Sequence, residues 1–322
     1  MTIVVAGGTG LAGSAIVRAY VAAGHEVIPV SRKVVDLLDR DATFDFITSV
    51  KPTLVIDAAA KVGGIGANNS YPVEFLADNV RIQNNLMEAA HASNVEKFIF
   101  LGSSCIYPRD CAQPIKEEYL LTGPLEETNS AYAVAKIAGI ELVKSFRKEY
   151  GRRWISLMPT NLYGPFDNFD LKTSHVLPAM IRKFHDAKVR SEQNYISVPE
   201  HVEGVELWGS GTPMREFLYV EDLAEAVVFA LENKFQDNLY NVGTGEDLTI
   251  KELAEMIQKI VGHTGEIHWD SSKPDGTPRK LMDVSKMTSA GWKAKTSLED
   301  GIRKTYEWFL QHQGEFKEVK ID

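Results

Sequence analysis

A tyrosine and a lysine four residues apart, Tyr132 and Lys136, carry the clearest acid-base chemistry in the sequence. The surrounding residues predict a helix from Ser130 to Tyr150, and side chains at i and i+4 lie on one face of a helix. A phenol with a pKa of about 10 is a poor proton donor at neutral pH, but a fixed neighbouring cation stabilises the phenolate and lowers that pKa. The spacing predicts a usable proton donor, although the same pattern also occurs by chance as a surface pair.

A serine and a cysteine follow a short apolar run upstream of that helix. The run, Phe98–Leu101, predicts a strand, and Ser103 and Cys105 come just after it. Ligands of open α/β sheets bind beyond the carboxyl ends of the strands. We therefore expect Ser103 to hydrogen-bond the same substrate oxygen as Tyr132. Cys105, taken alone, is typical of a small buried residue at a strand end.

Three glycines, Gly7, Gly10 and Gly13, lie between a predicted first strand and a predicted first helix. This spacing suits a dinucleotide, because backbone N–H groups must approach a pyrophosphate without an intervening Cβ, at the positive end of a helix dipole. An ordinary glycine-rich turn is the alternative. The strand before the glycines and the helix after them favour the dinucleotide site.

The end of the predicted second strand indicates which dinucleotide the loop would hold. NAD enzymes usually carry Asp or Glu about 20 residues beyond the loop, where it binds the ribose 2′-hydroxyl. Here the strand runs into Ser31, Arg32 and Lys33, and the planar guanidinium of Arg32 suits a 2′-phosphate. NADP(H) is therefore favoured. Asp36 keeps NAD open, and a solvated surface pair is the plainer interpretation of Arg32 and Lys33.

Alternating strands and helices in the first half of the chain supply the framework that these residues need. Gly24 and Gly151 follow two predicted helices, Leu11–Ala23 and Ser130–Tyr150, at the position where glycine adopts a left-handed conformation. The repeated pattern predicts an α/β fold with a parallel sheet covered on both faces. The predicted strands are Ile3–Ala6, Glu26–Val30, Leu54–Asp57, Phe98–Leu101 and Ile155–Met158.

Beyond Pro159 the alternation gives way to segments rich in Pro, Asn, Asp and Gly. These segments predict a second, smaller lobe of loops and short elements, mostly C-terminal. A helix at Glu221–Asn233 and a strand at Leu239–Val242 look like returns to the first domain. We expect a first domain of residues 1–160 with returns near 217–245 and 283–312, and a substrate-binding lobe of residues 161–216 and 246–282.

Composition narrows the class of protein. The 322 residues are 44% hydrophobic and 25% charged, which matches a globular average and excludes a disordered or collagenous chain. A net charge of −9 argues against nucleic acid and anionic membranes as partners, so an anionic ligand needs a locally basic pocket. Two cysteines cannot form a disulfide framework. Without a leader segment or a stretch of about 18 apolar residues, we expect a cytoplasmic protein.

The order of the glycine loop, Ser103, Tyr132 and Lys136 resembles the extended short-chain dehydrogenase/reductase family that acts on nucleotide sugars. Longer stretches over almost the whole chain are similar to the branch that converts GDP-4-keto-6-deoxy-D-mannose to GDP-L-fucose, by epimerisation at C3 and C5 and reduction at C4. The resemblance implies a Rossmann-type doubly wound parallel sheet, NADP(H) as cofactor, and a homodimer built through helices of the Rossmann domain. The stretches are Ala59–Ile65, Leu101–Pro108, Met158–Pro165, Trp208–Phe217 and Lys273–Lys280.

The resemblance also implies roles for individual residues. Cys105 and His175 would be the base and the acid of the epimerisation, and their ordinary pKa values of about 8.5 and 6.5 lie on either side of neutrality. Ser103 and Tyr132 would donate to O4, while Lys136 would lower the Tyr132 pKa and hold the nicotinamide ribose. The implied cofactor contacts are Gly7, Thr9, Gly10, Leu11, Ala12, Gly13, Arg32, Leu101, Gly102, Ser103, Lys136, Pro159, Asn161, Leu162 and His175. The implied substrate contacts are Lys183, Trp208, Arg215 and Asp275.

Several of these residues have plainer interpretations outside the family. His175 alone would cap or pack in the second lobe, and Trp208 alone is most often a core residue. Thr9 stands where some relatives carry a basic residue, so selectivity for NADP would depend more on Arg32. The polar segment Lys188–Val205 is longer than the resemblance leads us to expect, and no role follows for it.

Other functions remain open at this point. Another reductase or a 4-epimerase of the same family is possible, although a simple 4-epimerase would not need Cys105 and His175. A 4,6-dehydratase normally needs an Asp-Glu pair after the serine or threonine at the end of the fourth strand, where Ser104 and Cys105 stand instead. A regulator that senses NADP is a different class, but such a protein tends to lose the tyrosine or the lysine.

Overall fold

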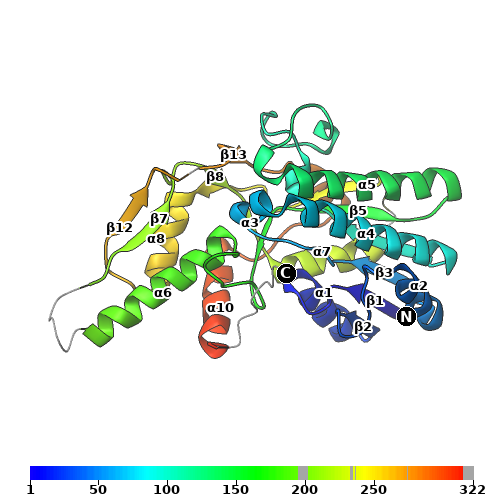
Figure 1. The fold of residues 1–322 in the computed structure, drawn as a ribbon, viewed down its shortest axis with the longest axis horizontal. Coiled ribbons are helices and arrows are strands. Elements are labelled where there is room, and N and C mark those ends of the chain that lie inside the picture. The colour runs from blue at the N-terminus through cyan, green and yellow to red at the C-terminus, as the bar shows by residue number, and fades with distance from the viewer. Residues whose placement is uncertain (195–201, 233–234, 236, 274, 315–322) are drawn as a thin grey trace.

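A six-stranded parallel sheet forms the centre of the molecule (Figure 1). The computed structural model describes residues 1–194, 202–232, 235, 237–273 and 275–314. The strand order is β10-β5-β4-β3-β1-β2, so the order reverses between β1 and β3 as in a doubly wound fold. The strands are β1 (Thr2–Ala6), β2 (Glu26–Val30), β3 (Leu54–Asp57), β4 (Lys97–Leu101), β5 (Ile155–Pro159) and β10 (Leu239–Val242). The predicted Rossmann-type parallel sheet is confirmed.

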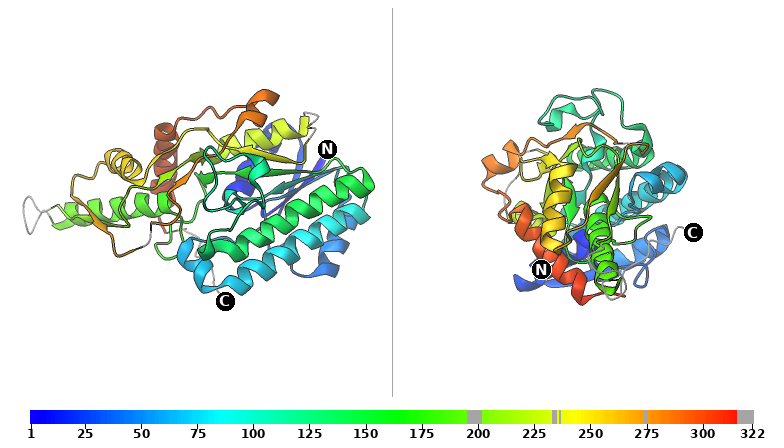
Figure 2. Two further views of the ribbon diagram at one scale, coloured as in Figure 1. Left: turned by 90° about the horizontal axis from the view of Figure 1, so that it is seen from above. Right: turned by 90° about the vertical axis from the view of Figure 1, so that its left-hand side faces the viewer.

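Helices cover both faces of this sheet. On one face α2 (Arg40–Val50), α4 (Pro72–Ala92) and α5 (Ser130–Tyr150) pack on a core that includes Phe98 and Phe100. On the other face α1 (Leu11–Ala22) and α7 (Val220–Glu232) pack on a separate core. Figure 2 shows α4 and α5 lying side by side along their face. Because the inner strands are covered twice, their residues are almost all apolar, as parallel strands require.

Glycines end two of these helices as predicted. Gly24 follows α1 with φ +79°, and Gly151 follows α5 with φ +66°. The left-handed backbone lets the N–H of Gly151 return to the carbonyl of Arg147 at 3.1 Å. Gly151 therefore marks the end of the helix that carries Tyr132 and Lys136.

The second half of the chain adds a smaller body beside the sheet, at the left of Figure 1. Helices α6 (Val176–Asn194), α8 (Ile250–Val261) and α10 (Leu298–Gln311) share a third core. Three small sheets accompany them, with orders β11-β8-β13, β12-β7 and β6-β9. Their strands are β6 (Asn161–Tyr163), β7 (Val205–Trp208), β8 (Met214–Arg215), β9 (Phe217–Tyr219), β11 (Leu248–Thr249), β12 (Ile267–Asp270) and β13 (Arg279–Lys280).

Two predicted segments extend past the described residues. The polar segment Lys188–Val205 begins as the last turns of α6, which run to Asn194, and its residues 195–201 lie outside the described part of the chain. The predicted helix Glu221–Asn233 is α7, and Asn233 likewise lies outside that part. Among the residues that the structure describes, no helix combines the length and hydropathy needed to cross a membrane.

The contact between α5 and β4 generates a first prediction. Gly139 is buried on α5, and a Cβ there would overlap the ring of Phe100. We expect Gly139→Ala to lower the free energy of unfolding by about 1–3 kcal/mol, the usual cost of overpacking. The matched control is Gly66→Ala in α3 (Ile65–Ser70), where a Cβ would meet nothing within 4 Å. That variant should be neutral or slightly more stable, and equal denaturant midpoints for the two variants would contradict the packing argument.

Candidate active site

The carboxyl end of β4 delivers Ser103 and Cys105 to the edge of the sheet. The N–H of Gly102 donates to the carbonyl of Leu157 on β5 at 2.9 Å, which keeps the chain in the plane of the sheet for one more residue. A single 3-10 turn, Ser104–Ile106, then begins. Ser103 caps this turn, because its Oγ accepts from the N–H of Cys105 at 3.4 Å. The two side chains are therefore fixed relative to each other by the backbone of one turn.

Tyr132 reaches the same place from α5. Its hydroxyl hydrogen-bonds Ser103, and its ring lies edge-on to Phe75 with the ring centres 6.4 Å apart. Burial raises the pKa of Tyr132 above its ordinary value, the nearby Cys105 and Asp57 raise it further, and the Ser103 hydrogen bond opposes the increase. The predicted meeting of Ser103 and Tyr132 is present in the structure, with the phenol in its protonated form.

Lys136 lies one turn further along α5 and is only 3% exposed. Its Nζ donates to the carbonyl of Leu101 at 2.9 Å, and it lies 4.7 Å from the centre of the Phe100 ring and 5.8 Å from that of Tyr132. Burial lowers the pKa of Lys136, while Asp57 and Cys105 act to raise it. We expect this lysine to lower the pKa of Tyr132, but the effect of burial is larger, and the pKa is raised.

Cys105 and His175 differ in their exposure. Cys105 is 7% exposed, and burial raises the pKa of its thiol while the Lys280 ammonium and the Ser103 hydroxyl oppose that change. His175 precedes α6 with its side chain exposed, so it does not pack in the core of the second lobe. Enough protein nevertheless surrounds the imidazole that desolvation lowers its pKa. Both groups are neutral at neutral pH in this environment.

The glycine loop has the geometry of an anion cradle. Gly7 has φ +73°, and a Cβ on it would lie 2.7 Å from the Ala58 carbonyl oxygen. A Cβ on Gly13 would overlap the carbonyl of Gly7. Gly10 offers no capping side chain, and the first turn of α1 holds no acidic residue. The N–H groups at the start of α1 are therefore open to an anion such as a pyrophosphate.

The residues after β2 favour Arg32 over Asp36 as a cofactor contact. Arg32 is exposed, and no carboxylate among the described residues forms an ion pair with it. Asp36 instead accepts from the N–H of Leu38 at 3.0 Å, within its own turn. Thr9, in the glycine loop, is exposed.

The four predicted substrate contacts come from the second lobe. Trp208 is 61% exposed, which shows that the core interpretation of this residue is wrong. Asp275 binds the turn that follows Trp208, where its Oδ1 accepts from the N–H of Ser210 at 2.7 Å. Arg215 is partly buried, and burial lowers its pKa while Asp275 and then Glu126 raise it. Lys183 is held differently, since its Nζ donates to the carbonyl of Glu206 in β7 at 2.8 Å.

Sequence reasoning missed Glu216, which is fully buried beside Arg215. Its Oε1 accepts from the N–H groups of Thr244 at 2.6 Å and Gly245 at 2.8 Å, and its Oε2 accepts from that of Met282 at 2.9 Å. One carboxylate thus joins the end of β10 to the segment after β13. A Glu next to an Arg carries no signal for this role in the sequence.

Lys280 is a second missed residue. It pairs in register with Arg215 across the parallel strands β13 and β8, so the two side chains share one face of the small sheet. Within the described part of the chain its ammonium has no hydrogen bond or ion pair. Burial lowers the pKa of Lys280, and Cys105 is the strongest of the nearby groups that oppose this change. In the sequence, Lys280 stands out only as the last residue of Lys273–Lys280, one of the stretches that carry the family resemblance.

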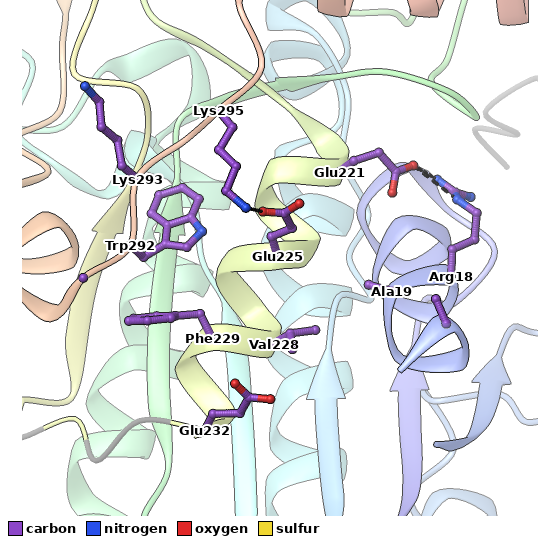
Figure 3. A pocket seen from close by; sticks show the side chains of 12 residues that line it. Arg18, Ala19, Glu221, Glu225, Val228, Phe229, Glu232, Trp292, Lys293 and Lys295 are labelled. Atoms are coloured by element: carbon purple, nitrogen blue, oxygen red, sulfur yellow. Dashed lines mark hydrogen bonds and ion pairs between the residues drawn. The ribbon is translucent and has the colours of Figure 1, made fainter. Parts of the chain in front are cut away.

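A hollow on another face of the protein is separate from this site. Figure 3 shows it between α1, α7 and the segment 291–295. Ion pairs line it, with Arg18 and Glu221 at 2.5 Å and Lys295 and Glu225 at 2.7 Å. None of the predicted site residues contributes to its lining.

Comparison with known proteins shows the family to which this chain is similar. The model of the NAD dependent epimerase/dehydratase family matches residues 3–243. A GDP-L-fucose synthase of Sinorhizobium fredii is 49% identical over 96% of this chain and 95% of the relative. The structure of a GDP-6-OMe-4-keto-L-xylo-heptose reductase from C. jejuni has a TM-score of 0.90 and 36% identity, covering 97% and 98% of the two chains. A GDP-L-fucose synthetase from Naegleria fowleri bound to NADP has a TM-score of 0.84 and 30% identity, covering 97% and 94%.

The environments of the two cysteines predict different reactivity. Cys111 is partly exposed and Cys105 is buried, and burial raises the pKa of both thiols. Exposure therefore decides which thiol reacts first, and we expect iodoacetamide at neutral pH to label Cys111 roughly tenfold faster than Cys105. Peptide mass spectrometry measures both rates, and Cys105→Ser and Cys111→Ser assign them. Faster labelling of Cys105 would show that the nearby ammonium groups outweigh burial.

Proposed function

The chain belongs to the NAD dependent epimerase/dehydratase family, and on that premise we propose that it converts GDP-4-keto-6-deoxy-D-mannose to GDP-L-fucose. The observation that carries this proposal is the single turn after β4, which holds Ser103 against the Tyr132 hydroxyl and sets Cys105 two residues away. Reduction at C4 needs the first pair only. A thiol beside that pair supplies the additional base that epimerisation at C3 and C5 requires.

The residues present fit a nicotinamide dinucleotide, and Arg32 supports NADP(H) in particular. The cradle of Gly7 and Gly13 has no room for a Cβ, and the open start of α1 suits the pyrophosphate. The other predicted cofactor contacts lie at the carboxyl ends of β4 and β5, at the edge where the nicotinamide half would lie. Leu101 and Pro159 end these strands, Gly102 follows β4, and Asn161 and Leu162 begin β6. NADPH, when bound, supplies the hydride for C4.

Cys105 and His175 would carry out the epimerisation. In the reactive form the thiol proton of Cys105 has passed to the imidazole of His175. The Cys105 thiolate then takes the proton alpha to the C4 ketone, the C–H electron pair moves into the carbonyl, and the His175 imidazolium returns a proton to carbon on the other face. Burial makes the Cys105 thiolate a stronger base and the His175 imidazolium a stronger acid, because it raises the first pKa and lowers the second. Hydrogen bonds from Ser103 and Tyr132 would stabilise the negative charge on O4.

Tyr132 would protonate O4 during reduction, while Ser103 holds the same oxygen. The proton leaves a phenolate, and the Lys136 ammonium, 5.8 Å from the ring centre, stabilises that charge. The carbonyl of Leu101 fixes the ammonium, so it need not reorganise as charge develops. Tyr132 therefore donates only when O4 becomes basic, and its raised pKa keeps the proton in place until then.

The second lobe would bind the GDP group. A net charge of −9 requires a local cation for the diphosphate, and Arg215 supplies one next to Lys280. The exposed ring of Trp208 offers a flat apolar surface on which a base can stack. Asp275 would accept from sugar or base, although it already holds Ser210, and Lys183 would approach from α6.

The proposal includes the predicted division of the chain, with residues 1–160 and the returns near 217–245 and 283–312 forming the NADP-binding domain. The core shared by α6 and α8 supports a separate lobe formed by residues 161–216 and 246–282. Helix α10, within the last return, packs in that same core. A homodimer and a cytoplasmic location remain predictions, and light scattering tests the first.

Two chemical steps at one site predict separable variants. With GDP-4-keto-6-deoxy-D-mannose we expect the wild type to consume NADPH and form GDP-L-fucose. The rate of GDP-L-fucose formation should fall about 10²–10⁴-fold in Cys105→Ala, His175→Gln and Tyr132→Phe. Absorbance of NADPH and identification of the sugar measure both steps, with Cys111→Ser as the control. If the wild type produced an unepimerised GDP-6-deoxyhexose, the assignment as a reductase would stand, and the roles of Cys105 and His175 as base and acid would be wrong. Absence of NADPH consumption would refute the substrate.

Arg32 predicts the preference for the phosphorylated cofactor. Loss of a charge-assisted hydrogen bond to the 2′-phosphate should raise the KM for NADPH roughly 10- to 100-fold in Arg32→Ala. The KM for NADH should change little, because NADH has no 2′-phosphate. Lys33→Ala is the matched control on the neighbouring exposed residue. Equal effects on both cofactors would assign Arg32 to the protein surface and reopen the case for Asp36.

A further inference from the structure

Asp57 is a buried charged residue that the reaction described above does not use. It ends β3 at the carboxyl edge of the sheet and is 0% exposed. Its Oδ1 accepts from the N–H of Ala59 at 3.1 Å, whereas its Oδ2 has no hydrogen-bond partner among the described residues. A buried carboxylate with an unpaired oxygen lowers the stability of the fold. Its presence beside a reaction site therefore points to a function.

The strand register shows which way Asp57 faces. Asp57 lies opposite Phe100 in the parallel pair of β3 and β4, and residues paired in this way point to the same face of the sheet. Phe100 faces α5, since its ring contacts the Lys136 ammonium and fills the space beside Gly139. Asp57 therefore points toward α5, on the side of the sheet where Lys136 is buried.

The charges of Asp57 and Lys136 compensate each other across the protein interior. No carboxylate in the described residues forms a direct ion pair with Lys136, whose Nζ is bound by the Leu101 carbonyl. Burial raises the pKa of Asp57 to about 6, and Lys136 is the first group that opposes this change. Burial lowers the pKa of Lys136, and Asp57 is the first group that opposes that one. Each charge thus offsets part of the desolvation of the other.

The other titratable groups nearby do not replace Asp57. From α5, Tyr132 is a protonated phenol whose pKa Asp57 helps to raise. From the turn after β4, Cys105 is a buried thiol that affects Lys136 less than Asp57 does. On α4, Asp78 is already paired with Lys61 at 3.6 Å and with Arg81 at 3.4 Å.

We propose that Asp57 is a positioning residue that keeps Lys136 in its ammonium form during the reduction step. The proposal rests on the function given above for Tyr132 and Lys136. Asp57 itself touches neither substrate nor cofactor in this role. It sets the upper end of the pH range in which Tyr132 can donate its proton beside a charged Lys136.

The pH profile of Asp57→Asn tests this role. Without the carboxylate, the pKa values of Lys136 and Tyr132 both fall, so the alkaline limb of NADPH oxidation should move down by about one pH unit. Solvent deuterium incorporation at C3 and C5, measured with NADP+ at a pH below the alkaline limb, should stay at the wild-type rate, because Tyr132 is still protonated there and the base is Cys105. Asp78→Asn is the matched control and should leave the limb in place. An unmoved limb in Asp57→Asn, with an active wild type, overturns the proposal.

A stability measurement tests the role of Asp57 independently of the proposed substrate. An acid whose folded pKa is raised from 3.8 to about 6 destabilises the fold progressively as pH rises through that window, and the full penalty remains above it. Asp57→Asn should therefore raise the Tm at pH 7 to 8 but not at pH 4. The gain should be larger in a Lys136→Met background, where the compensating ammonium is missing. If the Tm gain differs in this way between the two backgrounds but the substrate is not turned over, only the substrate assignment is wrong. If the Tm gain is the same in both backgrounds, Asp57 and Lys136 do not compensate each other and the proposal is overturned.

Discussion

The close contact between α5 and β4 is the constraint on which the site depends. Gly139 lets α5 approach Phe100, and the approach brings the Lys136 ammonium to the carbonyl of Leu101. The same helix then places Tyr132 one turn higher, where its hydroxyl meets Ser103. The proton donor, its partner and the cation are thus positioned by one helix on one strand, without any long loop.

The charged forms of the titratable groups in this site are stabilised only in part, and this changes their strength as acids and bases. Burial disfavours the charged forms of Cys105, His175 and Lys136 alike. Because burial disfavours the charged form, a buried thiolate takes up a proton more readily than it would in water, and a buried imidazolium or ammonium releases one more readily. Under the proposed roles, Cys105 and His175 would act as a stronger base and a stronger acid than in water, and the Lys280 ammonium offsets part of the rise in the Cys105 pKa.

Local patterns allowed much of this structure to be predicted from the sequence. The strands, the glycine loop and the spacing of Tyr132 and Lys136 each depend on residues that are close in the chain. Asp57, Glu216 and Lys280 could not be found in that way, because their roles arise from strand pairing and from contacts between distant segments. Trp208 shows the converse, since an isolated tryptophan indicates a core whereas its strand leaves the ring in solvent.

The Glu216 carboxylate has a mechanical consequence for any domain closure. Three backbone N–H groups from two segments converge on it, and the carbonyl of the same residue accepts from the side chains of Thr160 and Asn161 after β5. Hydrogen bonds to a charged group stabilise by about 1.5–3 kcal/mol each, so a hinge through this point would break several at once. The strand that carries Arg215 must therefore move with the sheet as one rigid piece. Phe217 and Tyr219, which follow Glu216, pack in one core with α6 and β7, so the same point also ties the core of the second lobe to the sheet.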